Sequence, residues 1–197
     1  MVSRKHKFII VTPPKTGSVS LTFALLDYIK YRRIVKQRPD CFDYSDDFGK
    51  YSKHATLRAM QAKWNRKVYG KLQDYHLVGT VRNPWDRMVS WWLWENTECL
   101  FEDFITQPTK FRAKQLVRDY FTTRKGNVID TFIRFENMQG DFDAFCGRVG
   151  IPKQELPHKN KTKKRRHYSE YYDDALRDVV ASQHAADIEH FGYEFEG

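Results

Sequence analysis

Cysteine is scarce in this chain, and the cysteines that it has show no pairing pattern. There are three, an odd number without a C-x-x-C spacing: Cys41, Cys99 and Cys146. Because disulfide frameworks and zinc sites need paired or regularly spaced cysteines, we expect neither. The His, Asp and Glu residues also form no cluster with metal-ligand spacing, so the sequence predicts a protein that works without a metal ion.

Long hydrophobic runs are missing as well. Residues 1–7 are basic, but the apolar run that follows, Phe8–Val11, is too short for the core of a signal peptide or for a membrane span. It leads straight into a polar turn. We therefore expect a cytoplasmic protein with no membrane span.

The composition is that of a compact domain. Hydrophobic residues make up 41% of the 197 residues and aromatic residues 15%, which is enough for a core and excludes a disordered chain. We expect a single domain over residues 1–197. The net charge of +9 has two interpretations, a solvated basic surface or a groove for polyanionic ligands, and nucleic acid is the rival ligand for such a groove.

The segment after Phe8–Val11 has the pattern of an anion site. The apolar run predicts a buried strand and Ser18–Arg33 predicts a helix, so Pro13–Gly17 forms a tight turn before a helix N-terminus. Such a turn gathers backbone N–H groups and the positive end of the helix dipole. Lys15 adds a full charge, and further hydroxyl donors are Thr16, Ser18 and Ser20. The pattern predicts a phosphate or sulfate site; a surface turn without a ligand is the alternative.

The P-loop of nucleotide triphosphatases is absent from this turn. That motif is G-x-x-x-x-G-K-[ST], whereas here the nearby glycine, Gly17, follows Lys15. A nucleotide-dependent kinase would also need acidic magnesium ligands at the end of a strand. The order of the residues therefore speaks against a small-molecule kinase.

A second strand–helix junction offers a partner site. Tyr75–Val81 predicts a buried strand, and Asn83 and Pro84 then fit the N-cap and the first position of a helix. Arg82 stands at the end of the strand, and Ser90 follows eight residues later, two turns into the helix. A guanidinium group and a hydroxyl group placed in this way can converge on one phosphate.

Both segments resemble those of the PAPS-dependent sulfotransferases. P-K-T-G-S at 14–18 resembles the family's 5′-phosphosulfate loop, and V-R-N-P-W-D-R-M-V-S at 81–90 resembles its 3′-phosphate segment. Phe132–Met138 and the C-terminal D-I-E-H-F-G-Y-E-F at 187–195 resemble later parts of the same enzymes. The chain is identified as a member of this superfamily, and it is most similar to the carbohydrate branch of Golgi and small bacterial sulfotransferases.

The resemblance implies a donor and the residues that hold it. The donor is PAPS (3′-phosphoadenosine 5′-phosphosulfate), the product is adenosine 3′,5′-bisphosphate, and no metal takes part. The implied binding residues are Lys15, Thr16, Gly17, Ser18, Val19, Ser20, Arg82 and Ser90. Val19 departs from the family, which has Ser or Thr at this place, and a missing hydroxyl donor to a charged ligand costs about 1.5–3 kcal/mol.

Sulfuryl transfer needs positive charge at the leaving phosphate and a base for the attacking hydroxyl. Lys15 is predicted to supply the charge. His54 is predicted to be the base, because K-H-A at 53–55 resembles the family's local pattern; a histidine that caps a helix starting near Thr56 is the alternative. The reserve candidates for the base are His158 and Glu95. The predicted acceptor is a carbohydrate hydroxyl, and small-molecule, lipid, phenol and peptide acceptors stay open.

The predicted fold is α/β, a P-loop-like three-layer fold with a central parallel sheet flanked by helices. Strands are expected near Lys7–Thr12, Tyr75–Val81 and Val128–Phe135. Helices are expected near Ser18–Arg33, Thr56–Trp64, Pro84–Asn96, Phe111–Thr122, Phe142–Val149 and Asp173–Ser182. Pro39–Tyr51 is expected to be a substrate-side loop. The basic run Asn160–His167 is either a solvated segment or, as the resemblance implies, a loop that folds over the cofactor.

Two other functions stay open beside the sulfotransferase. One is the nucleotide-dependent kinase, and the other is a non-catalytic relative whose basic surface binds nucleic acid. The second would explain the charge of +9 but not why Lys15, Arg82 and Ser90 fall at strand–helix junctions. We expect no nucleic-acid partner.

Overall fold

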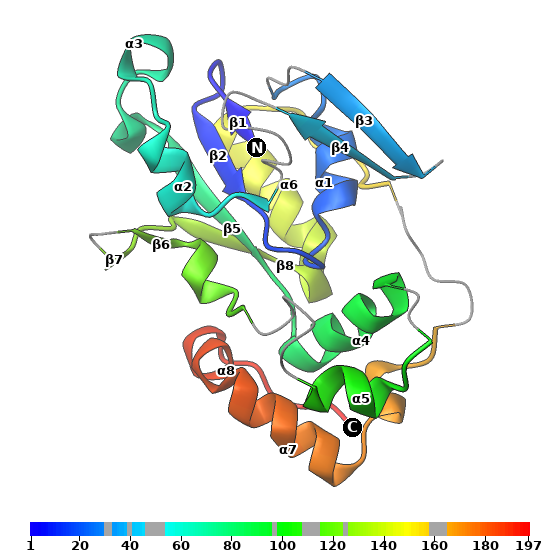
Figure 1. Ribbon diagram of the computed structural model, residues 1–197. Helices are drawn as coiled ribbons and strands as arrows, with labels where there is room; N and C mark the ends of the chain where they lie inside the picture. Colours follow the sequence, from blue (N-terminus) through cyan, green and yellow to red (C-terminus); the bar gives the residue numbers. More distant parts are fainter. Residues whose placement is uncertain are drawn as a thin grey trace. The chain divides into compact units, whose positions relative to one another are not determined.

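The computed structural model describes residues 1–29, 33–38, 41–45, 54–95, 98–107, 115–123, 126–157 and 165–197 (Figure 1). The chain forms two compact units. The first unit contains Met1–Val81 and Tyr120–Lys161, and the second contains Arg82–Asp119 and Thr162–Gly197. The single domain expected over 1–197 stays a prediction.

A four-stranded sheet forms the centre of the first unit. Its strands, in the order β1-β2-β5-β8, are Val2–Ser3, Phe8–Val11, His76–Val81 and Thr131–Arg134. Strands β2, β5 and β8 are parallel, and β1 pairs antiparallel with β2. Every residue of β2 is buried, as in a strand that is covered on both faces. The structure confirms the predicted α/β fold with a central, mostly parallel sheet.

Helices α1 (Ser18–Leu25) and α6 (Met138–Val149) cover one face of this sheet (Figure 1). The core beneath them includes Phe8, Ile10, Leu21, Leu25, Val78, Ile133, Phe142 and Phe145. Phe8 and Ile10 share a face because side chains alternate along a strand. Helix α6 corresponds to the predicted helix Phe142–Val149, and it begins about one turn earlier than expected, at Met138.

The opposite face depends on a glycine. Gly79 of β5 has no side chain, and a Cβ atom there would lie only 2.8–2.9 Å from the rings of Phe132 and Phe121. These rings pack edge to face, with their centres 5.4 Å apart.

Helix α2 (Leu57–Ala62) lies on the other side of β2 from α1 (Figure 1), and Thr56 caps it by accepting from the N–H of Ala59.

Two sequence predictions near the N-terminus are wrong. The helix expected over Ser18–Arg33 ends at Leu25, and Arg33–Arg38 forms strand β3. Strand β4, Cys41–Ser45, lies inside Pro39–Tyr51, the segment expected to be a loop, and it pairs antiparallel with β3. In β4 the aromatic residues Phe42 and Tyr44 alternate with Asp43 and Ser45, and β3 contains the β-branched pair Ile34 and Val35, so both segments favour strands over a helix. The rest of that loop lies outside the described residues.

The helix predicted over Phe111–Thr122 is wrong in its described part. Arg118–Tyr120 is one turn of 3-10 helix, and Thr122–Thr123 is strand β6, which pairs antiparallel with β7 (Gly126–Asn127). Helix α3 (Arg66–Tyr69) is a further short element that the sequence analysis did not predict.

Four helices make up most of the second unit. They are α4 (Pro84–Glu95), α5 (Phe101–Thr106), α7 (Asp174–Gln183) and α8 (Ala185–Phe191) (Figure 1). The residues buried among them include Trp85, Met88, Val89, Trp91, Phe104, Tyr168 and Val180. Asn83 caps α4 as predicted, since its Oδ1 accepts from the N–H groups of Trp85 and Asp86 at 3.0 and 3.4 Å. Helices α5 and α8 were not predicted.

A buried carboxylate holds the segment before the 3-10 turn. Asp187 on α8 is 1% exposed, and its two oxygens accept from the N–H groups of Val117 and Arg118 at 2.7 and 2.9 Å. Arg87, fully buried on α4, donates to the carbonyl of Gln115 through both terminal nitrogens at 3.3 Å. These contacts take up backbone groups that a helix would need, which is why the predicted helix does not form here.

The environment of Asp187 fixes its charge. Burial alone raises the pKa of this carboxyl, but the neighbouring His184 and the N–H groups of Arg118 and Val117 outweigh it. The charge of Arg87 acts in the same direction, and the pKa of Asp187 lies below its ordinary value. Because the folded-state pKa is lowered, this stabilisation is fully present above about pH 4 and is lost as the pH falls further.

Replacing Asp187 by asparagine is expected to lower the free energy of unfolding by about 1.5–3 kcal/mol at pH 6, since a buried charged acceptor of two N–H groups is lost. The measurement is urea unfolding of the full chain at pH 6 and pH 3. Asp178→Asn is the matched control, because that carboxylate is 71% exposed and forms only surface pairs. The deficit of Asp187→Asn should shrink at pH 3; an equal deficit at both pH values would contradict the assigned charge.

Candidate anion-binding site

The loop at the carboxyl end of β2 has an unusual backbone. Lys15 has a φ of 69° and Gly17 a φ of 89°, both in the left-handed region. For a lysine this conformation costs about 1 kcal/mol or more, and such strain persists only where the surroundings fix it. The loop that the sequence predicted to bind an anion is therefore held in a defined shape.

Thr16 fixes that shape. Its hydroxyl donates to the carbonyl of Pro13 at 2.7 Å, and its Oγ1 lies 2.5 Å from Oγ1 of Thr80 on β5. Since a hydroxyl has one proton, Thr80 is the donor of the second bond. The expectation that the Thr16 hydroxyl donates to a ligand is thereby corrected, because its proton is used within the protein. Of the groups of Thr16, the backbone N–H stays a predicted donor to a bound anion.

The loop opens directly onto the N-terminus of α1. The N-cap residue is Gly17, which has no side chain, and the helix has no side-chain cap. The first N–H groups of a helix have no acceptor within it, so those of Ser18, Val19 and Ser20 are placed to bind an anion. The φ of 89° at position 17 favours glycine, and a Cβ atom there would also displace the end of the Met138 side chain, whose Cε would lie 2.6 Å away.

His54 lies at the start of the same loop. Its Nδ1 is 2.7 Å from the carbonyl oxygen of Thr12, a residue 42 positions away in the chain. A carbonyl can only accept, so Nδ1 carries the proton, and Nε2 is the nitrogen that can take up another. The alternative in which His54 caps the next helix is wrong, because Thr56 is the N-cap of α2. The structure thus brings the predicted base and the predicted anion loop together.

The second predicted segment opens the second unit. Arg82 is 4% exposed, and its Nε donates to Oδ2 of Asp86 at 2.7 Å. Asp86 and Ser90 are four residues apart on α4, so they lie on the same face of the helix. Through Asp86 the guanidinium of Arg82 is therefore held on the helix face that carries Ser90.

The sequence analysis missed Asp86, and it considered Arg165 only as a member of the basic run 160–167, not as a partner of Asp86. Nη2 of Arg165, at the end of the basic run 160–167, pairs with Oδ1 of Asp86 and lies 3.3 Å from the Asp86 carbonyl. Two guanidinium groups on one carboxylate leave a net positive charge there, which suits a phosphate. The spacing of four residues between Arg82 and Asp86 is a signal that could have indicated the first pair. Residues 160–164 of the basic run lie outside the described residues.

The reserve candidates for the base are less well placed. Glu95 is exposed, and its Oε1 accepts from Nε1 of Trp91, one turn earlier on α4. His158 lies outside the described residues. Within the described ranges, no group of three or more His, Cys, Asp or Glu side chains could hold a metal ion. A search of the described helices for one long and apolar enough to cross a membrane gives none.

Comparison with known families gives one result. A model described as the sulfotransferase family matches residues 1–194, a span that includes both anion-binding segments and His54. No curated protein and no solved structure matches the chain.

Proposed function

The chain belongs to the sulfotransferase family, whose members are PAPS-dependent enzymes, and we propose that it transfers the sulfuryl group of PAPS to a carbohydrate hydroxyl with His54 as general base. The observation that carries this proposal is the loop at 12–17. Its left-handed Lys15 and Gly17 lead into an uncapped helix, and the ring of His54 is hydrogen-bonded to the first residue of the loop.

The residues present fit both anionic ends of PAPS. The N–H groups of the loop and of the first turn of α1, together with Lys15, would hold the 5′-phosphosulfate. In the second unit, Arg82 and Ser90 would take the 3′-phosphate, as the resemblance of residues 81–90 to the family's 3′-phosphate segment implies.

When bound, PAPS supplies the sulfuryl group, and adenosine 3′,5′-bisphosphate is the product. The ammonium group of Lys15 and the loop N–H groups stabilise the negative charge that develops on the leaving phosphate. Nε2 of His54 takes the proton of the acceptor hydroxyl. The Thr12 carbonyl then stabilises the imidazolium, because it already accepts from Nδ1–H.

The proposed carbohydrate acceptor is supported by charge and by the C-terminal resemblance. The first unit has 23 Lys and Arg against 11 Asp and Glu, whereas the second has 11 against 14, so the basic excess belongs to the first unit. An acidic glycan would be attracted to it. The cytoplasmic location of the protein stays a prediction.

Replacing Arg82 by alanine is expected to weaken binding of adenosine 3′,5′-bisphosphate roughly ten- to a hundredfold, since charged hydrogen bonds to the 3′-phosphate are lost. Calorimetric titration measures this, with ATP and magnesium as the competing ligand. Arg177→Ala is the matched control, because it removes one positive charge from surface pairs of the same unit. Thermal unfolding of each variant shows that it is folded.

The two outcomes separate the candidate functions. Micromolar binding of the bisphosphate that is lost in Arg82→Ala and kept in Arg177→Ala supports the proposed donor site. If the wild type binds ATP with magnesium but not the bisphosphate, the donor site is wrong and the kinase interpretation returns.

A further inference from the structure

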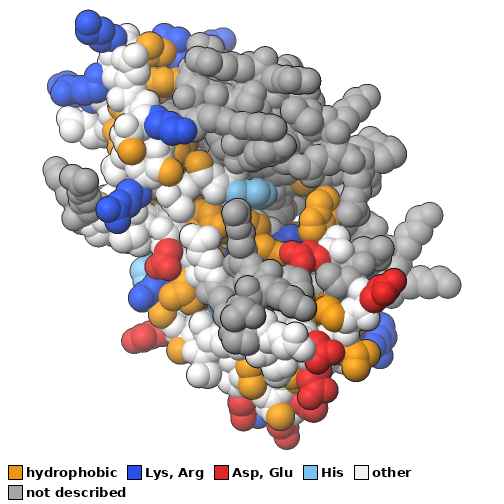
Figure 2. Space-filling view, viewed as in Figure 1, with side chains coloured by type: hydrophobic (Ala, Val, Ile, Leu, Met, Phe, Trp, Pro, Cys, Tyr) orange, Lys and Arg blue, Asp and Glu red, His pale blue; other side chains and the backbone are white. Residues whose placement is uncertain are grey.

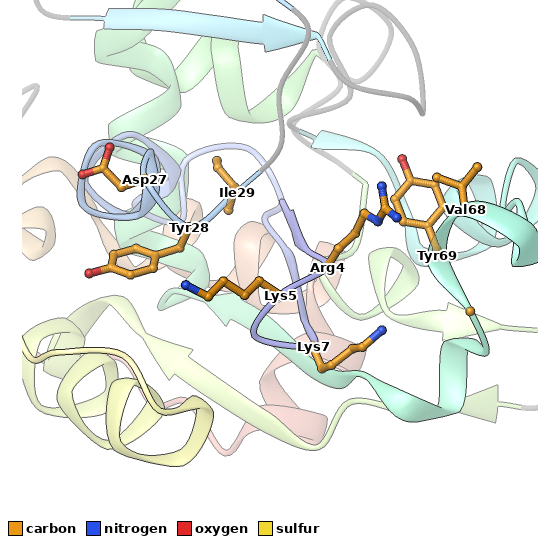
Figure 3. A pocket seen from close by; sticks show the side chains of 9 residues that line it. Arg4, Lys5, Lys7, Asp27, Tyr28, Ile29, Val68 and Tyr69 are labelled. Atoms are coloured by element: carbon orange, nitrogen blue, oxygen red, sulfur yellow. The ribbon is translucent and has the colours of Figure 1, made fainter.

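A second basic hollow lies on the first unit, away from the donor loop. It is a cavity of about 570 Å³ lined by Arg4, Lys5 and Lys7, by residues 27–29 after α1 and by residues 68–70 at the end of α3 (Figure 3). The three cations come from one turn, the connection between β1 and β2, and Figure 3 shows their side chains fanning out from it. A cavity of this size suits part of an extended ligand.

This cavity is separate from the donor loop. The turn at 4–7 precedes the first residue of β2, whereas the donor loop follows its last residue. The four residues of β2 span roughly 10–13 Å, and they separate the two ends of the strand. A ligand in the cavity therefore contacts different groups from a donor bound at Lys15.

The charges in the cavity are strongly one-sided. Arg4, Lys5 and Lys7 are all exposed, and within the described ranges no carboxylate lies at ion-pair distance from any of them. Asp27 is the one acidic residue among those that line the cavity. Exposed Arg66 and Lys67 continue the basic surface over α3, where Figure 2 shows Lys and Arg side chains gathered at the upper left. Such an arrangement favours an anion with several charges.

The aromatic residues of the region are already used by the protein. Arg4 lies 5.9 Å from the ring centre of Tyr69 and Lys7 4.8 Å from that of Tyr75, and both rings are buried. Tyr28 contacts His6 edge to face, with ring centres 5.4 Å apart. Single-stranded nucleic acid needs exposed ring faces on which bases stack. The cavity thus offers three cations and, among its lining residues, a single half-buried ring in Tyr28, which favours sulfate and carboxylate groups over a run of stacked bases.

We propose that this cavity is a second binding site, which takes the sulfate or carboxylate groups of an acidic polysaccharide. In naming a polysaccharide the inference rests on the proposed function. The site would hold the chain at a distance from the reacting hydroxyl, so it contributes affinity and leaves the chemical step unchanged.

The test compares two double variants that each remove two positive charges. Arg4→Gln with Lys5→Gln alters the cavity and leaves Lys7 in place, while Arg118→Gln with Arg177→Gln alters exposed pairs of the second unit. Binding of dextran sulfate is measured by fluorescence anisotropy in low salt, with neutral dextran and polyuridylate as rival ligands. Adenosine 3′,5′-bisphosphate is titrated against every variant.

The cavity variant is expected to bind dextran sulfate roughly tenfold more weakly, with a smaller salt dependence, while the control variant changes less than twofold. Equal loss in both variants would overturn the inference, because it would show a general charge effect. Tighter binding of polyuridylate than of dextran sulfate, lost in the cavity variant, would replace the polysaccharide by a nucleic acid. If the cavity variant still binds the bisphosphate as the wild type does, its donor site is intact. A failure of the proposed polysaccharide site can then be distinguished from a failure of the proposed function.

Discussion

Replacing His54 by glutamine is expected to lower turnover by about 10²–10⁴-fold, the range that a positioned general base contributes. Affinity for adenosine 3′,5′-bisphosphate should stay within about twofold. Glutamine can still donate to the Thr12 carbonyl through its amide, so the contact that holds residue 54 against the donor loop is kept. What glutamine lacks is a nitrogen that takes up a proton, which isolates the chemical role from the structural one.

The assay for this variant does not require a known acceptor. Hydrolysis of PAPS, in which water takes the place of the acceptor hydroxyl, is followed beside transfer to a panel of oligosaccharides. His76→Gln is the matched control, since it removes a half-buried imidazole of the same unit that is hydrogen-bonded to Thr131. Full turnover in His54→Gln, with loss in Glu95→Gln or His158→Gln, would transfer the role of base to one of those residues.

The strands and helices that the sequence predicts well are those whose signals are local. The apolar run Phe8–Val11 and the run His76–Val81 are buried strands in the structure, and each predicted end is right to within two residues. Asn83 caps its helix as predicted, and Thr56 and Asp173, the first residues of two predicted helices, are the N-caps of those helices. Where the deciding contact lies within a few residues, the sequence is sufficient.

The predictions that fail depend on distant contacts. The segment at 115–123 has helix-forming residues, but Asp187, about 70 positions later, binds its N–H groups and fixes another backbone. The Thr16 hydroxyl was expected to face the ligand, and instead it is bonded to Pro13 and to Thr80, 64 positions away. No local pattern contains such contacts, and tertiary structure overrides propensity there.

The candidate site shows both cases. Its loop and Arg82 were predicted from the order of residues at strand–helix junctions, which is local information. The geometry on which the proposed role of His54 rests, a fixed Nδ1–H against the Thr12 carbonyl, needs a contact across 42 positions. The pairing of Arg165 with Asp86 spans 79 positions and was missed for the same reason.

Replacing Lys15 by asparagine is expected to lower turnover by about 10²–10³-fold, since a group that stabilises charge at the leaving phosphate is removed. The same change should leave the free energy of unfolding unchanged or raise it by up to about 1 kcal/mol. Asparagine tolerates the left-handed backbone better than lysine does, so the substitution relieves the strain at a φ of 69°. Loss of activity together with equal or higher stability is the expected signature of a catalytic residue held in a strained loop.

Lys7 provides the matched control. Within the described part of the chain, Lys7 and Lys15 are the two non-glycine residues with a positive φ, and Lys7 has a φ of 51°. Lys7→Asn should therefore gain similar stability in urea unfolding while PAPS hydrolysis stays unchanged, because this lysine precedes β2 and the donor loop follows it. If Lys15→Asn kept full turnover, the strain at position 15 would have no catalytic purpose and another cation would have to stabilise the leaving phosphate. If both variants lost stability instead, the two lysines would be held by their side chains, and relief of backbone strain would not govern either position.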